Sequence, residues 1–270
     1  MAETENYVVT IVKYGTLETI KSDVFLNYSI YGEPDAPIEM GYFFWIVHNP
    51  QRTIVVDTGF SRRGGQRRHR TSLIDVAVAL NMLGIAPASN PDVVLTHAHY
   101  DHIGNLDLFS ESRILVSNNE YQFWTGGQSA RAQFRHSVET AEIAGLQRAF
   151  AQGRVSTFDN AFSLAPGIEI IRVGGHTPGQ SIVKVSTTDG TVLLASDAIH
   201  FYEEYEHDRP FTYVADLVAM YDAFDRIRAM LEAEATAHLV TGHDASTLER
   251  FRPVEGELAG LAATIGGSDD

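Results

Sequence analysis

Short apolar runs bounded by polar turns alternate along the chain with longer segments whose apolar residues recur every three or four positions. Runs rich in β-branched and aromatic residues are typical of strands, and the longer spacing is typical of helices. The expected strands are residues 7–12, 42–47, 53–56, 92–95, 113–116, 155–158, 168–173, 181–185, 191–195 and 238–241. The expected helices are residues 72–84, a segment that opens at 103–106, most of 118–153, and 213–234.

Each half of the chain combines strands with helices that can cover one face of a sheet, which predicts an α/β fold, a four-layer αββα sandwich. No linker divides the chain, so we expect one domain over residues 1–265 and a disordered polar tail, 266–270. Residues 15–40 mix glycine and proline with aromatic residues and predict a long loop. The last helix is expected to bury a stripe made of Leu217, Met220, Tyr221, Phe224, Ile227 and Leu231.

Composition narrows the class of protein. The chain has 270 residues, 44% of them hydrophobic, which suits a single layered domain. It has no cysteine, so disulfides, thiolate metal ligands and a cysteine nucleophile are excluded. Residues 1–6 lack the basic and apolar regions of a secretory signal. No apolar run reaches the roughly 18 residues that span a bilayer, so we expect a cytoplasmic protein without membrane contact.

The formal charge of −15 argues against nucleic acid as a partner, because an acidic surface repels phosphates. One basic segment, residues 62–70, departs from this balance and contains Arg62, Arg63, Arg67, Arg68 and Arg70. The interpretation we favour is a solvated, mobile loop. The alternative is a lid near a functional site that meets an anionic group or an acidic partner subunit.

Candidate chemistry is concentrated in one stretch that directly follows the apolar run 93–95. His97, His99, Asp101 and His102 lie within six residues, and imidazole and carboxylate are ligands that zinc prefers. In an extended segment, residues two apart point the same way, so His97 and His99 can hold one ion. Asp101 and His102 follow where a helix should begin and can face a second ion nearby.

Three further candidate ligands follow apolar runs and lie beside glycine, proline or a small residue. They are His176 in Gly-His-Thr-Pro-Gly, Asp197 in Ala-Ser-Asp, and His243 in Thr-Gly-His. This setting is typical of side chains presented by loops at strand ends, where functional residues concentrate. Asp57, in Val-Asp-Thr-Gly, has the same setting.

The order of these motifs resembles the metallo-β-lactamase superfamily over residues 40–245, most of the chain. The resemblance implies the same αββα fold and assigns the ligands of two zinc ions, with iron or manganese as possible replacements. The first ion takes His97, His99 and His176; the second takes Asp101, His102 and His243; Asp197 bridges them. Asp57 is expected to accept a hydrogen bond that orients a ligand or a loop. A hydroxide held between the ions would attack a carbonyl.

Chain length, the Asp-Thr-Gly motif and the complete ligand set look most like N-acyl-homoserine lactonases. Those enzymes usually place a tyrosine three residues after the bridging aspartate, but His200 stands there in this chain. His200 can donate the same hydrogen bond, act as a general acid, or be a satisfied polar residue beside the metal ligands. Tyr202 is a second substitute, and the candidate catalytic residues are therefore Asp101, His200 and Tyr202.

Three hypotheses remain open at this point. The first is a dizinc lactonase whose apolar acyl pocket is built from residues 15–40 and 120–135. The second is a hydrolase of another ester, a thioester or an activated aryl ether, which the change to His200 favours. The third is a non-catalytic metal-binding subunit. The expected substrate is a small molecule with an apolar portion, and the resemblance makes a homodimer or higher oligomer a further expectation.

Overall fold

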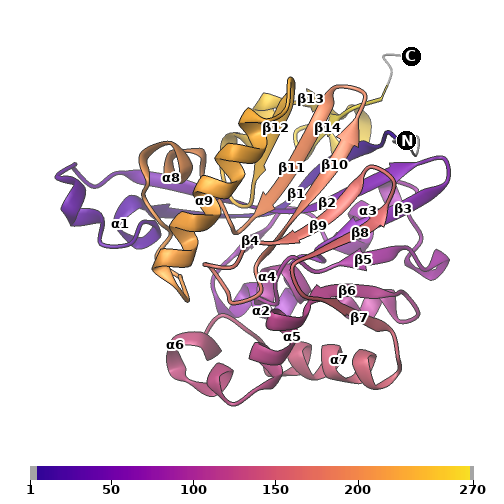
Figure 1. The fold of residues 1–270 in the computed structure, drawn as a ribbon, viewed down its shortest axis with the longest axis horizontal. Coiled ribbons are helices and arrows are strands. Elements are labelled where there is room, and N and C mark those ends of the chain that lie inside the picture. The colour runs from indigo at the N-terminus through magenta and orange to yellow at the C-terminus, as the bar shows by residue number, and fades with distance from the viewer. Residues whose placement is uncertain (1–4, 268–270) are drawn as a thin grey trace.

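Two β-sheets face each other at the centre of the molecule, and helices cover their outer faces (Figure 1). The computed structural model describes residues 5–267. The strands are β1 (Val8–Ile20), β2 (Pro37–Asn49), β3 (Arg52–Val56), β4 (Thr71–Ser72), β5 (Asp92–Val94), β6 (Ile114–Ser117), β7 (Val155–Phe158), β8 (Ala161–Ala165), β9 (Ile168–Arg172), β10 (Ser181–Thr187), β11 (Gly190–Ser196), β12 (Ala237–Thr241), β13 (Arg252–Pro253) and β14 (Ala262–Ile265). The α-helices are α1 (Lys21–Val24), α2 (Arg62–Arg67), α3 (Val76–Met82), α4 (Tyr100–Ile103), α5 (Asn118–Thr125), α6 (Ala132–Arg135), α7 (Thr140–Ala151), α8 (Tyr202–His207) and α9 (Leu217–Glu232).

The larger sheet has the strand order β13-β14-β1-β2-β3-β5-β6-β7, with β4 paired to β1. Strands β3, β5, β6 and β7 run parallel, whereas β1 and β2 form a long antiparallel pair. The smaller sheet has the order β12-β11-β10-β9-β8, in which β11 and β12 are parallel. The functional motifs follow β3, β5, β11 and β12, so parallel pairing brings their carboxyl ends to a common edge of the two sheets.

Three apolar clusters define the layers. One cluster fills the space between the sheets and joins residues such as Trp45 of β2 to Val183 of β10. A second packs α3 and α7 against the outer face of the larger sheet, with Leu80 and Leu146 among its buried members. A third packs α9 onto the smaller sheet through Phe224. The four-layer αββα architecture predicted from the sequence is confirmed.

Several local expectations were wrong. The expected loop over residues 15–40 is shorter and covers residues 21–36, because β1 continues to Ile20 and pairs with β2 from Pro37. Gly15 obscures this strand in the sequence; it lies at a shift in the pairing register, where a glycine is tolerated. In α9, Met220, Phe224 and Ile227 are buried as expected.

Two other residues of the expected α9 stripe lie outside the core: Leu217 and Tyr221 are 40% and 38% exposed. The buried side of this helix includes Ala223 instead, which a pattern based on large apolar residues does not select.

The structures of the basic segment, 62–70, and of residues 266 and 267 also differ from the expectations. Residues 62–67 form helix α2, whose N-terminus is capped by Ser61 Oγ, rather than the expected loop. Near the C-terminus, the backbone N–H groups of Gly266 and Gly267 donate to Asp189 and Thr188. The remaining residues of the expected tail, 268–270, lie outside the described part of the chain. Within that part, no helix has the length and apolar character needed to cross a bilayer.

Candidate metal centre

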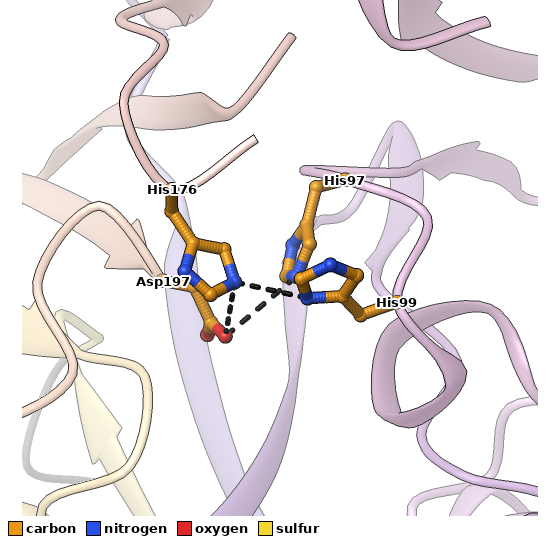
Figure 2. Close-up of side chains that lie close together, drawn as sticks. All are labelled: His97, His99, His176 and Asp197. Atoms are coloured by element: carbon orange, nitrogen blue, oxygen red, sulfur yellow. Dashed lines mark hydrogen bonds and ion pairs between the residues drawn. The ribbon is translucent and has the colours of Figure 1, made fainter. Parts of the chain in front are cut away.

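The ends of four strands deliver the candidate ligands to one place. His97 and His99 lie in the loop after β5, and His102 lies on α4, the short helix that follows. His176 is in the loop between β9 and β10, Asp197 directly follows β11, and His243 follows β12. In Figure 2, His176 and Asp197 extend from one side and His97 and His99 from the other, with their polar atoms converging.

The side chains form two groups in which the candidate ligand atoms lie within 4.8 Å of one another. The first group, shown in Figure 2, contains His97, His99, His176 and Asp197, and its closest pair is His99 Nδ1 and His176 Nε2 at 2.9 Å. The second group contains Asp101, His102 and His243. In that group the Asp101 carboxylate lies 3.8 Å from His243 Nε2 and 3.9 Å from His102 Nε2.

Asp197 lies between the two groups. Its Oδ2 atom lies 3.3 Å from His176 Nε2 and 3.6 Å from His97 Nε2. Its Oδ1 atom lies 3.3 Å from His102 Nε2 and 3.2 Å from His243 Nε2. His243 Nε2 also lies 3.3 Å from Oδ2. One carboxylate is therefore in contact with histidines of both groups.

The donor set fits divalent metal ions on an observation independent of motif matching. Three buried polar atoms of the candidate ligands that face the cluster have no hydrogen-bond partner: His97 Nε2, His102 Nε2 and Asp197 Oδ1. A buried polar atom without a partner costs free energy, so such atoms are rare unless a ligand or ion satisfies them. Their concentration at one point, with imidazole and carboxylate chemistry only, is typical of a metal centre.

Burial also sets the protonation of the first group. Burial lowers the pKa of His97 and of His176 well below the ordinary value, and it lowers the pKa of His99 to about 3. These imidazoles are therefore neutral near pH 7 and keep a free lone pair, the form that binds a metal. Burial opposes ionisation of Asp197 as well, but the surrounding histidines, His243 and His102 foremost, hold its pKa well below the ordinary value.

Hydrogen bonds to the far side of the rings orient the second group. His102 Nδ1 lies 2.7 Å from Asp57 Oδ2, and His243 Nδ1 lies 2.7 Å from the carbonyl oxygen of Gly41. Asp57 also accepts hydrogen bonds from the backbone N–H and the hydroxyl of Thr96, at 2.8 and 2.7 Å. Asp57 thus lies behind His102, where such a carboxylate fixes the ring and leaves Nε2 facing the cluster.

Glu120, on α5, is a functional residue that the sequence analysis missed. Its buried carboxylate accepts hydrogen bonds from the backbone N–H of Ala98 and of Gly179, from the Thr177 hydroxyl and from the indole N–H of Trp124. Glu120 therefore connects the loop that carries His97 and His99 to the loop that carries His176. The pattern Ser-Asn-Asn-Glu at 117–120 signals the start of a helix, but it gives no sign of this contact.

Glycines allow the ligand loops to pack closely. A side chain at Gly179 would place its Cβ atom 2.2 Å from the Glu120 backbone nitrogen, and one at Gly242 would place its Cβ atom 2.7 Å from Asp197 Oδ1. Neither distance is compatible with a side chain. The loops can therefore meet around the cluster only because these positions lack one.

His200 lies against the cluster but not at its open side. It is fully buried, its ring stacks on Phe211 at 3.9 Å, and its Nε2 atom lies 3.3 Å from Asp197 Oδ2. Its Nδ1 atom lies 3.0 Å from Glu204 Oε2, a second buried carboxylate that the sequence did not reveal. Burial lowers the pKa of His200, but Glu204 and Asp197 outweigh it and raise the value to about 9.

Tyr202 points away from the cluster. Its hydroxyl donates to the carbonyl oxygen of Leu239 at 3.0 Å, and the Arg250 guanidinium lies 3.4 Å from the centre of its ring. The tyrosine is thus held in the wall behind the site, and its placement does not match the expected substitution for the tyrosine of the lactonases.

A cleft of about 260 Å³ opens onto the cluster. Its lining residues are Met40, Tyr42, Arg68, Arg70, His99, Tyr100, Asp101, His136, Ser137, His176, Asp197, Phe211, Tyr213 and His243. The expected acyl pocket from residues 15–40 and 120–135 was therefore wrong, since only Met40 from those segments lines this cleft. Phe123 and Phe134 line a separate cavity beside Gly174.

Comparison with known proteins identifies the family. A sequence profile described as the metallo-beta-lactamase superfamily matches residues 38–243, which is most of the chain. The chain belongs to the metallo-β-lactamase superfamily. The resemblance predicted from the order of five motifs is thus confirmed.

Relatives of this superfamily member include N-acyl homoserine lactonases. It is 23% identical to the N-acyl homoserine lactonase AttM of Azorhizobium caulinodans over 269 residues, which cover 91% of this chain and 96% of the lactonase. It is 34% identical to metallo-beta-lactamase domain-containing protein 1 of Xenopus laevis over 120 residues, 44% of this chain and 42% of that protein. With the Bacillus cereus lactonase it shares 26% identity over 49% of the relative. The chain thus spans about half the length of these last two relatives.

Solved structures share the fold. A quorum-quenching N-acyl homoserine lactone lactonase superposes with a TM-score of 0.77 at 19% identity, covering 93% of this chain and 98% of the lactonase. The hydrolase AbOPH of the beta-lactamase superfamily superposes with a TM-score of 0.72 at 16% identity, covering 99% of this chain and 97% of AbOPH. At such low identity the similarity shows the architecture of this superfamily member and leaves its substrate open.

Proposed function

We propose that this protein is a dinuclear metal-dependent hydrolase that opens a lactone or cleaves an ester in a small molecule with an apolar portion. The observation that carries the proposal is the position of Asp197, whose carboxylate lies 3.2–3.6 Å from histidines of both groups. A carboxylate between two sets of candidate ligands suits two neighbouring ions.

The candidate ligands form a complete set for each of two ions. His97, His99 and His176 would hold one ion, and Asp101, His102 and His243 would hold the other, with Asp197 shared. Zinc suits these nitrogen and oxygen donors, and iron or manganese suits them too. Two such ions, when bound, supply Lewis-acid activation of water and of a substrate carbonyl.

Residues of the chain itself would prepare this chemistry by orientation. Asp57 and the Gly41 carbonyl hold the rings of His102 and His243, as described above. Asp101 lines the cleft, so its carboxylate is also placed to exchange a proton with a bound substrate. His200 would act through Asp197 as a positioning residue, because Phe211 separates it from the open cleft.

The lining of the cleft and the relatives of the chain both bear on the substrate class. Met40, Phe211 and Tyr213 give the cleft an apolar side that suits an acyl or aryl portion. The relatives named as N-acyl homoserine lactonases favour a lactone. The histidine three residues after Asp197 instead favours another ester, a thioester or an activated aryl ether.

The test combines metal analysis with a substrate panel. Purified protein would be stripped with a chelator, reloaded with zinc, and assayed on an N-acyl homoserine lactone, an aryl ester, a thioester and an activated aryl ether. We expect two equivalents of bound metal and turnover that disappears on chelation and returns on reloading. Two bound equivalents without turnover of any compound would instead support a non-catalytic metal-binding subunit.

A further inference from the structure

Arg70 is a half-buried cation on the wall of the metal cleft. Its Nε atom donates to the Tyr100 hydroxyl at 3.0 Å, and its Nη1 atom donates to the carbonyl oxygen of Arg68 at 2.9 Å. These two bonds hold the guanidinium in place on neutral acceptors. They leave Nη2 without an acceptor among the residues that the structure describes.

The charge of Arg70 is not balanced by a carboxylate. Within residues 5–267 it forms no ion pair, whereas the neighbouring Arg67 and Arg68 both pair with Glu139, at 2.6 and 2.8 Å. Arg68 is further held by the carbonyl oxygen of His136 at 2.7 Å. The Arg70 guanidinium lies 5.7 Å from the centre of the Tyr42 ring, and the charge of Asp101 favours its protonated form, but no carboxylate of the described residues is within ion-pair distance. A partly buried cation in this position favours an anionic ligand.

The cleft has two chemically different sides. The Arg70 side includes Tyr42, whose ring lies 5.0 Å from the ring of His243, and Tyr100, which directly precedes Asp101. The apolar side lies by the first group of candidate ligands, where the ring of Phe211 lies 6.2 Å from the ring of His176. A substrate that spans the cluster would meet a cation at one end and an apolar surface at the other.

We propose that Arg70 binds a carboxylate of the substrate, so that this protein prefers an anionic ester, lactone or thioester to a neutral one. The proposal rests on the hydrolase function proposed above and names its substrate class. A guanidinium is planar, and the edge that Arg70 leaves open can pair with a carboxylate through Nη1 and Nη2. A neutral acyl homoserine lactone has carbonyl acceptors but no carboxylate to form this bidentate pair.

Binding can be measured without turnover on the metal-loaded protein. The probes are succinate, glutarate and adipate, each compared with its monomethyl ester by calorimetry. Both members of a pair keep one carboxylate for the metal ions, and only the diacid has a second for Arg70. We expect at least one diacid to bind ten-fold or more tighter than its monoester, with the preference lost in Arg70→Gln and only partly kept in Arg70→Lys, which retains the charge but not the planar fork.

Arg63 provides the matched control, because it is an exposed arginine of α2 that does not line the cleft. Arg63→Gln should keep the full preference for the diacid, and unchanged affinity of Arg70→Gln for the monoesters would show that its cleft is intact. Equal binding of every diacid and monoester by the wild type, or a preference that persists in Arg70→Gln, would overturn the proposal.

A kinetic comparison separates this proposal from the proposed function. Mono(4-nitrophenyl) glutarate and 4-nitrophenyl butyrate differ in the distal carboxylate, and Arg70→Gln should lower kcat/KM for the first by 10-fold to 100-fold through KM. The second should change less than two-fold. If neither ester is hydrolysed but the diacid preference behaves as expected, the hydrolase function fails while the anion site stands. An equal loss on both esters would contradict a role in recognising the carboxylate.

Discussion

The two groups of candidate ligands are held in place by different means. In the group of Asp101, His102 and His243, both histidines have a direct partner at Nδ1, the Asp57 carboxylate and the Gly41 carbonyl oxygen. In the group of His97, His99 and His176, the partner of His97 Nδ1 is a hydroxyl at 3.3 Å, and His176 Nδ1 has none.

The two groups thus show two ways of holding candidate metal ligands in position. Direct hydrogen bonds fix each ring of one group, so its geometry depends on single contacts. In the other group the rings depend on the backbone of two loops, and Glu120 joins those loops through three hydrogen bonds. Changes to the supports should therefore affect the two groups separately, and the following predictions test this.

The largest expected effect is on the acid stability of metal-free protein. Burial lowers the folded-state pKa of His99 to about 3, so its contribution is present above the unfolded value and is lost as pH falls from about 6.5 to about 3. At about 1.4 kcal/mol per unit, the free energy of unfolding should fall by roughly 3–5 kcal/mol over this range. His97 and His176 add further loss of stability in acid, so His99→Gln should reduce the measured fall by about this amount in denaturant titrations, whereas His207→Gln, at an exposed position, should leave the fall unchanged.

His102 should show the opposite sign in the same measurement. Burial lowers its pKa, but Asp197 and Asp57 outweigh burial and raise it well above the ordinary value. Its stabilising contribution is therefore present below pH 6.5 and is lost as pH rises through the folded-state pKa. If the free energy of unfolding depended on pH in the same way in His99→Gln and His102→Gln, the expected difference between the two groups would be contradicted.

A smaller effect is expected from Asp57→Asn. This change weakens the hydrogen bond behind His102, and loss of such a support typically lowers metal affinity about 10-fold to 100-fold. Because Asp57 contacts the second group alone, one of two bound equivalents should be lost at a lower chelator concentration than in the wild type. Metal analysis across a chelator series measures this, and simultaneous loss of both equivalents would show that the two groups are not independent.

The smallest effect is expected from Glu120→Gln. The amide keeps one acceptor oxygen and places an NH₂ group near N–H and O–H donors, so about two of the four hydrogen bonds are lost. A cost of about 1–2 kcal/mol in the free energy of unfolding follows from typical hydrogen-bond contributions. The chelator series should now weaken the equivalent held by His97, His99 and His176. Glu111→Gln, at an exposed position, is the control and should change neither quantity.

The fold and the convergence of the candidate ligands were predictable from the sequence because their signals are local. Each candidate ligand follows an apolar strand and lies in a short motif. These motifs can be recognised directly in the sequence. Asp57 was selected for the same reason. The long β1–β2 hairpin was missed because Gly15 and Pro37 are residue types that are typical of loops, although both lie in paired strands.

The supports and the cleft wall were not predictable, because they depend on contacts between distant segments. Glu120 meets Gly179, 59 positions away, and no local pattern indicates that contact. Arg70 and Tyr213 meet the ligands only after helix α2 and the segment before α9 have packed around the cleft. Tyr202 shows the converse error, because a position close in sequence to Asp197 holds a side chain that points elsewhere.

The absence of side chains at Gly179 and Gly242 has a consequence for how this protein can change its specificity. The loops that carry the ligands are packed so closely that mutation has almost no freedom there. The cleft wall is different, because Arg70, His136 and Tyr213 belong to separate segments that carry none of the ligands. Substitutions in one wall segment at a time can therefore change which compounds the cleft binds. The candidate metal ligands can stay unchanged while this happens.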